Sequence, residues 1–289
     1  MHKIIEYKNK NITMILDDIL KEKKKEVEKF KSSIDESAYK SKALNFFNGS
    51  RSLKGALKPR SNGEAVSYRI CSIIAEVKKA SPSKGLLSAD YKPEEIASLY
   101  EKGGASAISV LTDKKFFMGS PSDITKVRDK VNLPVLRKDF IIDEIQVFES
   151  KLIGADALLL IIKALKETDY KKLLTLAGEL SLDVLTEISD EDELEIAYKY
   201  NAEIIGINSR DLRTFKTDLF KTANLAERIP VGKLIIAESG INGRNDIEML
   251  MKRGVNSFLI GEALVTSTNA AETLKNFLSP YSMDNYYIQ

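Results

Sequence analysis

The sequence predicts a single α/β domain over residues 1–289, a closed (β/α)8 barrel of the TIM-barrel type with an N-terminal helical extension at residues 12–48. Three observations favour this fold. The length of 289 residues exceeds slightly the roughly 250 that such a barrel needs. From about residue 73, short runs of Ile, Val and Leu alternate with longer amphipathic segments. Eight such units favour closure of a parallel sheet over an open one.

Each unit pairs one expected strand with one expected helix. The apolar runs that predict strands lie at 73–77, 107–111, 134–136, 157–162, 183–185, 203–207, 233–237 and 257–260. The amphipathic segments that predict helices lie at 92–102, 121–130, 143–153, 167–180, 191–200, 218–228, 245–252 and 270–277. Gly103, Gly154 and Gly254 follow three of these segments, as helix-ending glycines do.

The segment before the barrel has a different pattern. Residues 12–33 predict a helix that lies against the barrel, because the apolar side chains form one face: Ile12, Leu16, Ile19, Val27 and Phe30. The many lysines and glutamates of this helix are expected to form a solvated face. Residues 46–62 are expected to be loop, and the tail after Ser279, with Tyr286, Tyr287 and Ile288, has no clear pattern.

Composition excludes several classes of protein. The 44 basic and 42 acidic residues nearly cancel, which argues against a nucleic-acid or anionic-membrane partner. Cys71 is the only cysteine, so no intramolecular disulfide can form and a reducing compartment is expected. No apolar run could span a bilayer and residues 1–11 lack a signal-peptide core, so we expect a cytoplasmic protein. We expect a monomer, and complexes with other chains stay open.

The single histidine, His2, narrows the chemistry further. It lies in an expected N-terminal tail, so histidine-based catalysis and multi-histidine metal sites are not expected. An enzyme with this composition must carry out its chemistry with carboxylates, lysines and arginines, or with a bound cofactor.

Charged residues follow the predicted strands where a barrel carries its active site, at the carboxyl ends. Because side chains alternate along a strand, Glu76 and Lys78 share one face, and so do Asn208 and Arg210. Six charges, three of each sign, are expected to converge at the mouth: Glu76, Lys78, Lys138, Glu187, Arg210 and Glu238. Removing charges from water is unfavourable unless opposite charges pair, so a cluster with equal numbers of each sign can be buried. The alternative is a set of salt bridges at the rim with no chemistry.

Glycines follow the last two predicted strands. Gly240 and Gly261 stand where barrel enzymes often bind phosphate through backbone N–H groups, because glycine lets the backbone approach the oxygens closely. A simple turn is the alternative for either glycine alone.

Several motifs, in order along residues 12–278, resemble the indole-3-glycerol-phosphate synthase family. The most specific is IAEVKKASPSKG at 74–85, and LRKDFI at 136–141, LTE at 185–187, INSRDL at 207–212 and AESGI at 237–241 follow. The resemblance implies a phosphorylated small-molecule substrate, 1-(2-carboxyphenylamino)-1-deoxyribulose 5-phosphate. The substrate is closed to an indole with loss of carbon dioxide and water, without cofactor or metal, in tryptophan biosynthesis.

The resemblance also implies roles for single residues. Lys138 takes the place of the family's general acid and Glu187 that of its second acid–base group, with pKa values expected to shift toward neutrality. Lys78 would supply positive potential near the ketone or the phosphate, and Glu76 would orient the lysines. The remaining positions would bind substrate: Arg210, Asn208 and Ser81 at its carboxylate, Glu238 as a polar wall, and Ser239, Gly240 and Gly261 at its phosphate. Phe117 and Phe140 would pack on its ring or simply fill the core.

Two features depart from the family pattern. Glu262 stands where many relatives have serine, and its side chain is expected to turn away from a phosphate. The first ten or so residues have no counterpart in the family.

Three rival functions stay open. A phosphoribosylanthranilate isomerase would use a Cys and an Asp, but Cys71 lies before the active, carboxyl end of the first predicted strand. A Schiff-base aldolase would use Lys138 or Lys163, and a non-catalytic scaffold would have a degraded charge cluster.

Overall fold

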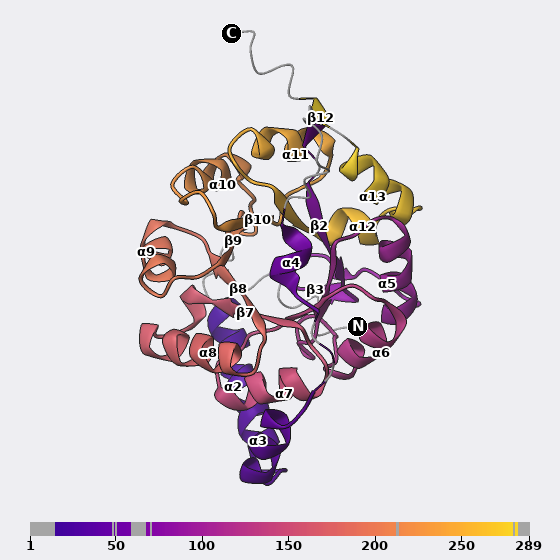
Figure 1. The fold of residues 1–289 in the computed structure, drawn as a ribbon. Helices are drawn as coiled ribbons and strands as arrows, with labels where there is room; N and C mark the ends of the chain where they lie inside the picture. Colours follow the sequence, from indigo (N-terminus) through magenta and orange to yellow (C-terminus); the bar gives the residue numbers. More distant parts are fainter. Residues whose placement is uncertain are drawn as a thin grey trace.

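Eight parallel strands close into a barrel, as predicted (Figure 1). The computed structural model describes residues 15–47, 49, 51–58, 68–69, 71–211, 214–279 and 281–282; the expectations for His2, Ile12 and the tail at Tyr286, Tyr287 and Ile288 lie outside them. The barrel strands, in spatial order, are β2 (Ser72–Val77), β5 (Ala107–Leu111), β6 (Val135–Lys138), β7 (Ala157–Ile161), β8 (Asp183–Ile188), β9 (Ile204–Asn208), β10 (Leu234–Glu238) and β11 (Ser257–Ile260).

Helices surround the barrel and return the chain from each strand to the next (Figure 1). They are α5 (Pro93–Lys102), α6 (Ser122–Lys130), α7 (Glu144–Leu152), α8 (Glu167–Glu179), α9 (Glu191–Lys199), α10 (Leu219–Ala226), α11 (Arg244–Met251), α12 (Glu262–Val265) and α13 (Ala270–Leu278). Gly154 and Gly254, which follow α7 and α11, have φ near +90°, the left-handed conformation that ends a helix with little strain at glycine.

Strand register brings the predicted charged residues to the same end of the barrel. Glu238 of β10 pairs with Asn208 of β9, and Glu187 of β8 pairs with Ile161 of β7. Lys138 of β6 pairs with Leu111, the last residue of β5. All of these residues lie at the carboxyl ends of their strands, because the strands are parallel and in close register.

The opposite end of the barrel is closed by α4 (Leu53–Leu57), which corrects the expectation of a loop over residues 46–62. Leu53 and Leu57 are buried among strand residues of the barrel interior, and Ser52 caps the helix by accepting a hydrogen bond from the Gly55 N–H. The short helix forms because tertiary burial of two leucines compensates for its weak intrinsic helicity.

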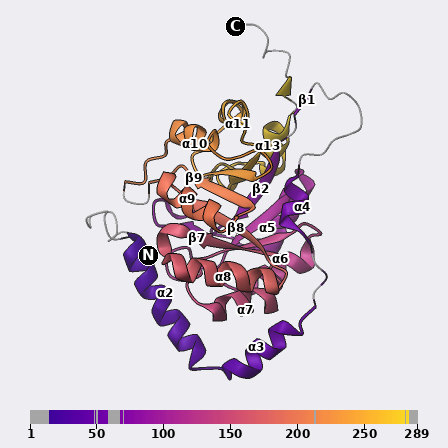
Figure 2. The ribbon, with the colours of Figure 1, turned by 60° about the vertical axis from the view of Figure 1, so that its left-hand side comes forward.

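The N-terminal extension consists of α2 (Ile15–Lys31) and α3 (Glu36–Leu44), and α3 packs against α7. Figure 2 shows α2 along the side of the barrel remote from α4. Ile19 and Val27 are buried as predicted, but the expectation of a fully solvated lysine face is wrong at one position. Lys23 is 3% exposed, because three carboxylates lie within ion-pair distance of its ammonium group.

Two small antiparallel pairs flank the barrel. β3 (Ala80–Ser81) pairs with β4 (Gly85–Leu86) directly after β2, at the active end. β1 (Tyr68–Arg69) pairs with β12 (Tyr281–Ser282), a short strand that the sequence pattern did not indicate. None of the helices in the ranges given above has both the length and the apolar character that a membrane span requires.

Candidate active site

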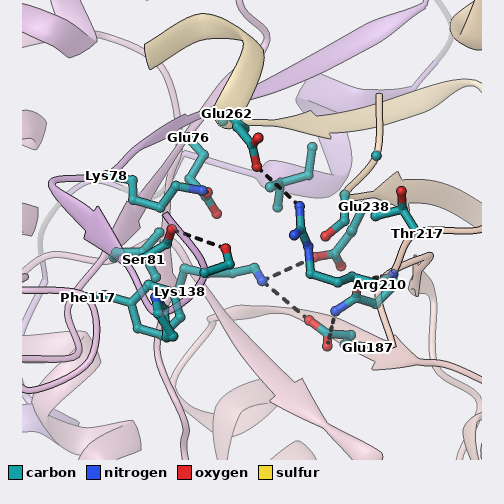
Figure 3. Close-up of a pocket in the computed structure, with 18 of the residues that line it drawn as sticks. Glu76, Lys78, Ser81, Phe117, Lys138, Glu187, Arg210, Thr217, Glu238 and Glu262 are labelled. Carbon is teal, nitrogen blue, oxygen red and sulfur yellow. Dashed lines mark hydrogen bonds and ion pairs between the residues drawn. The ribbon is translucent and has the colours of Figure 1, made fainter. Parts of the chain in front are cut away.

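A cavity of about 440 Å³ opens at the carboxyl ends of the strands, a size typical of small-molecule sites. It is lined by every residue that the sequence placed in the site: Glu76, Lys78, Ser81, Phe117, Lys138, Phe140, Glu187, Asn208, Arg210, Glu238, Ser239, Gly240 and Gly261. Figure 3 shows the charged members of this set pointing toward one another from different strands. Sequence order and barrel closure therefore bring thirteen separately predicted residues into one cavity.

Lys138 occupies the centre of the charged cluster (Figure 3). Its Nζ lies 3.3 Å from Glu187 Oε2 and 3.2 Å from Glu238 Oε2. Glu187 also accepts a hydrogen bond of 3.0 Å from Asn208 Nδ2, which fixes its other oxygen. This arrangement holds an ammonium group between two carboxylates that can exchange protons with a bound molecule.

Glu76 and Lys78 form a second ion pair at the end of β2. Lys78 Nζ donates to Glu76 Oε1 at 2.6 Å, as expected for two residues on one face of a strand. Burial by itself raises the pKa of Glu76, but Lys78 and Lys138 outweigh it, so the net pKa lies below the usual value. Glu76 is therefore a stable anion that balances the two lysines.

The environment of Lys138 shifts its pKa away from neutrality, contrary to the expectation from the sequence. Burial lowers the pKa of the ammonium group, but the carboxylates of Glu238, Glu187 and Glu76 outweigh burial and raise it well above its ordinary value. Lys138 thus remains protonated at neutral pH.

Glu238 is the group whose pKa moves toward neutrality. Burial raises the pKa of its carboxyl to about 7, Lys138 opposes that shift, and Glu187 reinforces it. Lys138 Nζ forms an ion pair with Oε2 of Glu238 at 3.2 Å, whereas Oε1 accepts no hydrogen bond from the described part of the chain. A buried carboxyl that faces a cavity with unused hydrogen-bonding capacity is suited to contact a polar group of a ligand.

The raised pKa of Glu238 predicts a titration of both activity and stability. The unfolded chain releases this proton near the ordinary glutamate pKa of 4.5, whereas the folded carboxyl keeps it until about pH 7. The free energy of unfolding should therefore fall as pH rises from 4.5 through about 7. Glu238→Gln cannot lose a proton; its melting temperature should exceed that of the wild type by a few degrees at pH 8 and match it below pH 4.5. An inflection of kcat/KM near pH 7 should be present in the wild type and absent from the variant. Identical pH profiles of the two proteins would refute this assignment.

Two glycines make room for the buried carboxylates. A Cβ atom on Gly206 of β9 would lie 2.1 Å from Glu238 Oε1, and one on Gly261 would lie 2.4 Å from Glu76 Oε1. Gly261, predicted only as a phosphate cradle, is therefore also required next to Glu76. Gly206 was not predicted, although a glycine inside an apolar strand run is a known signal of close approach.

The two residues that directly follow β10 have left-handed backbone. Ser239 and Gly240 have φ of 65° and 73°, an uncommon left-handed conformation for the serine in particular. The Ser239 carbonyl accepts a hydrogen bond of 2.8 Å from Ser209 Oγ, which supports this turn. Strained backbone of this kind is concentrated at ligand-binding sites.

Glu262 does not turn away from this end of the cavity, which corrects the expectation. It begins α12, lines the cavity, and lies 3.2 Å from both Arg210 Nη2 and Lys84 Nζ (Figure 3). The two cations offset the charge of its carboxylate and draw the side chain inward.

One wall of the cavity is apolar. The rings of Phe117 and Phe140 lie 6.3 Å apart between centroids, at an angle of 36°. Ile15 and Ile19 of α2 also line the cavity. The sequence assigned Ile19 only to packing against the barrel and did not single out Ile15. Phe215 and Thr217 also line the cavity, and no signal in the sequence indicated them.

The fold and the site together define the class of protein: a (β/α)8-barrel enzyme whose cavity at the carboxyl ends of the strands holds a buried cluster of opposite charges beside aromatic and glycine residues. The chain belongs to the family described as indole-3-glycerol phosphate synthase, whose model matches residues 16–277. It is 43% identical over 272 residues to an indole-3-glycerol phosphate synthase of Acetivibrio thermocellus, covering 91% of this chain and 99% of that protein.

Other comparisons agree. Indole-3-glycerol phosphate synthases of Chlorobium phaeovibrioides and Endomicrobium trichonymphae are 44% and 45% identical, over 88% and 91% of this chain and 95% and 98% of their own. Among solved structures, a thiamine phosphate pyrophosphorylase from Pyrococcus furiosus matches with a TM-score of 0.55 at 15% identity, over 72% of this chain and 93% of that one. That last likeness concerns the fold alone.

Proposed function

We propose that this chain is an indole-3-glycerol phosphate synthase that converts 1-(2-carboxyphenylamino)-1-deoxyribulose 5-phosphate to indole-3-glycerol phosphate, a step of tryptophan biosynthesis. By reaction type it is a carbon–carbon lyase, a carboxy-lyase. The observation that carries the proposal is a buried, protonated Lys138 between Glu187 and Glu238 in the cavity. Membership of the family supports the choice of substrate.

Lys138 is the general acid of ring closure. The ring carbon that carries the carboxylate attacks the ketone carbon, a carbon–carbon bond forms, and the ketone oxygen must receive a proton. The neighbouring carboxylates keep the pKa of Lys138 high, so a proton is present at neutral pH. Loss of carbon dioxide then restores the aromatic ring.

Glu187 serves the dehydration that follows. The new hydroxyl leaves as water with an added proton, and a proton is lost from the adjacent carbon of the new ring. Glu187 lies beside Lys138 and is oriented by Asn208, so one site can supply groups for both transfers.

The rest of the cavity orients the substrate. Ser239, Gly240 and Gly261 bind the phosphate, and Phe117 and Phe140 flank the aromatic ring. Arg210, Asn208 and Ser81 bind the carboxylate. Glu76 balances Lys78, whose charge attracts the substrate's anionic end.

The rival functions are less compatible with the geometry. Cys71, which an isomerase would need at the active end, precedes β2, and its thiol lies 3.7 Å from the Phe277 carbonyl. Lys163, an aldolase candidate, is exposed, and Lys138 is held in the protonated form that cannot form a Schiff base.

We further propose that the enzyme works as a cytoplasmic monomer without metal or cofactor, and without a nucleic-acid or membrane partner. The near balance of charge supports this, as does a set of proton-transfer groups supplied by the chain itself. In the ranges that the structure describes, no cluster of His, Cys, Asp and Glu has the makings of a metal site.

Incubation of the purified chain with the carboxyphenylamino substrate tests the function directly. Indole fluorescence should rise with time, with carbon dioxide released in equal amount, because ring closure and decarboxylation are coupled. The rate should be unchanged after exhaustive chelation and dialysis. No indole product from folded protein would refute the function, whereas activity restored only by a divalent ion would refute metal independence alone.

A further inference from the structure

A buried lysine on α2 joins the N-terminal helix to the active end of the barrel. Lys23 lies one turn from Ile19 and one turn from Val27, on the face that packs against the barrel. Its Nζ lies 2.8 Å from Glu26 Oε2, 3.0 Å from Asp113 Oδ2 and 2.9 Å from Asp139 Oδ1. A buried ammonium group with several carboxylate partners is an expensive feature that a solvated helix face would not need.

One partner, Asp139, directly follows the general acid Lys138. Its Oδ1 accepts a hydrogen bond of 2.8 Å from the Phe140 N–H and also forms the ion pair with Lys23. Its Oδ2 accepts a hydrogen bond of 2.6 Å from the Thr112 hydroxyl. Arg137 Nη2 donates to the same oxygen at 3.2 Å. The carboxylate therefore fixes the backbone on which both Lys138 and Phe140 are carried.

The second partner, Asp113, follows β5 and organises the loop that carries the other aromatic side chain. Its Oδ1 accepts N–H groups of Phe116 at 2.7 Å and Phe117 at 3.3 Å, while its Oδ2 binds Lys23. The loops after β5 and β6 thus meet at one ammonium group. Their rings, Phe117 and Phe140, are the pair that forms the apolar wall.

Helix α2 contributes to the same wall. Ile15 and Ile19 line the cavity, and Lys23 is the next residue along that face of the helix. The apolar wall therefore has contributions from α2 and from the loops after β5 and β6. Lys23, on α2, contacts an aspartate of each loop.

We propose that Lys23 is a positioning residue that shapes the part of the cavity where the aromatic ring of the substrate binds. It acts through Asp113 and Asp139 and does not touch the reacting atoms. The inference rests on the proposed function, because that function places an aromatic ring against Phe117 and Phe140. The anion site at β10 and β11 should be independent of it.

Two probes separate the two ends of the cavity. Anthranilate represents the aromatic end, and its own fluorescence can be followed because the chain has no tryptophan. Inorganic phosphate represents the other end. Both are titrated into folded protein well below its melting temperature, and KM and kcat are measured with the full substrate.

Lys23→Met keeps the length and apolar stem of the side chain but removes its charge. We expect it to weaken anthranilate binding and to raise KM by about five- to tenfold, since small misplacements of binding groups are costly, with the Kd for phosphate within about twofold. Lys24→Met, a change at the exposed neighbour on the same helix, should leave every value unchanged. Lys23→Arg should restore part of the anthranilate affinity.

Asp113→Asn provides a second measurement if Lys23→Met does not fold, because Lys23 keeps Asp139 and Glu26 as partners. It should also weaken anthranilate selectively. Equal weakening of both probes, or a lower melting temperature with unchanged anthranilate affinity and KM, would overturn the inference. Wild-type protein that neither binds anthranilate nor forms indole would instead refute the proposed function, and this inference with it.

Discussion

Lys138→Ala should lower kcat by at least about a hundredfold, the usual effect of losing a positioned general acid. The structural reason is that Lys138 is the cation between Glu187 and Glu238, so its removal takes away the proton donor and leaves two carboxylates facing each other. Their repulsion should raise the pKa of Glu238 further. Single-turnover measurement of indole formation checks the chemical step, and circular dichroism checks the fold.

A matched control is available at the end of the next strand. Lys163 follows β7 and is exposed, so Lys163→Ala should leave turnover unchanged. The same two variants address the aldolase alternative, since borohydride reduction in the presence of an aldehyde substrate should trap no adduct on either lysine. Near-normal turnover in folded Lys138→Ala would refute its role as the acid.

The barrel could be predicted from sequence because each of its signals is local. Apolar runs such as 157–162 and amphipathic segments such as 167–180 show their periodicity without knowledge of their neighbours. The site could be predicted because the fold fixes where parallel strands end. Once β6 and β8 were placed, Lys138 and Glu187 had to lie at the same mouth.

The features that could not be predicted depend on partners distant in the sequence. Lys23 looks like one more solvated lysine until Asp113 and Asp139, about a hundred residues away, are placed beside it. The pKa of Lys138 depends on the sum of three carboxylates from three other strands, whose signs were known but whose distances were not. Glu262 faces inward for the same reason, because Arg210 and Lys84 approach it only in the folded chain.

Arg210→Lys should reduce kcat/KM by roughly 1.5–3 kcal/mol, the range for a lost charge-assisted hydrogen bond. The change keeps the positive charge but loses the planar, five-donor fork that binds a carboxylate through two parallel hydrogen bonds, so it is not conservative at such a site. Asn208 Oδ1 accepts the Arg210 backbone N–H at 3.0 Å, so the two proposed carboxylate ligands are held together.

The position of Arg210 sharpens the experiment. Its Nη2 lies 3.2 Å from Glu262, at the start of α12, where the phosphate is proposed to bind. An arginine that serves the phosphate would lose affinity for inorganic phosphate on change to lysine, whereas one that serves the carboxylate would lose affinity for anthranilate. We expect the second result, with the Kd for phosphate changed by less than about threefold, because lysine keeps the charge.

Glu262→Gln serves as the matched control, because it removes the counter-charge of Arg210 without altering the guanidinium. It should strengthen inorganic phosphate binding, since an anion near that site is lost, and should leave anthranilate binding nearly unchanged. Both variants are measured with the two probes at one ionic strength, because exposed charge interactions are screened by salt. If phosphate binding collapses in Arg210→Lys while anthranilate binds as in the wild type, the arginine serves the phosphate. The substrate would then lie in the cavity in the reverse orientation, with its carboxylate toward the other cations of the cluster.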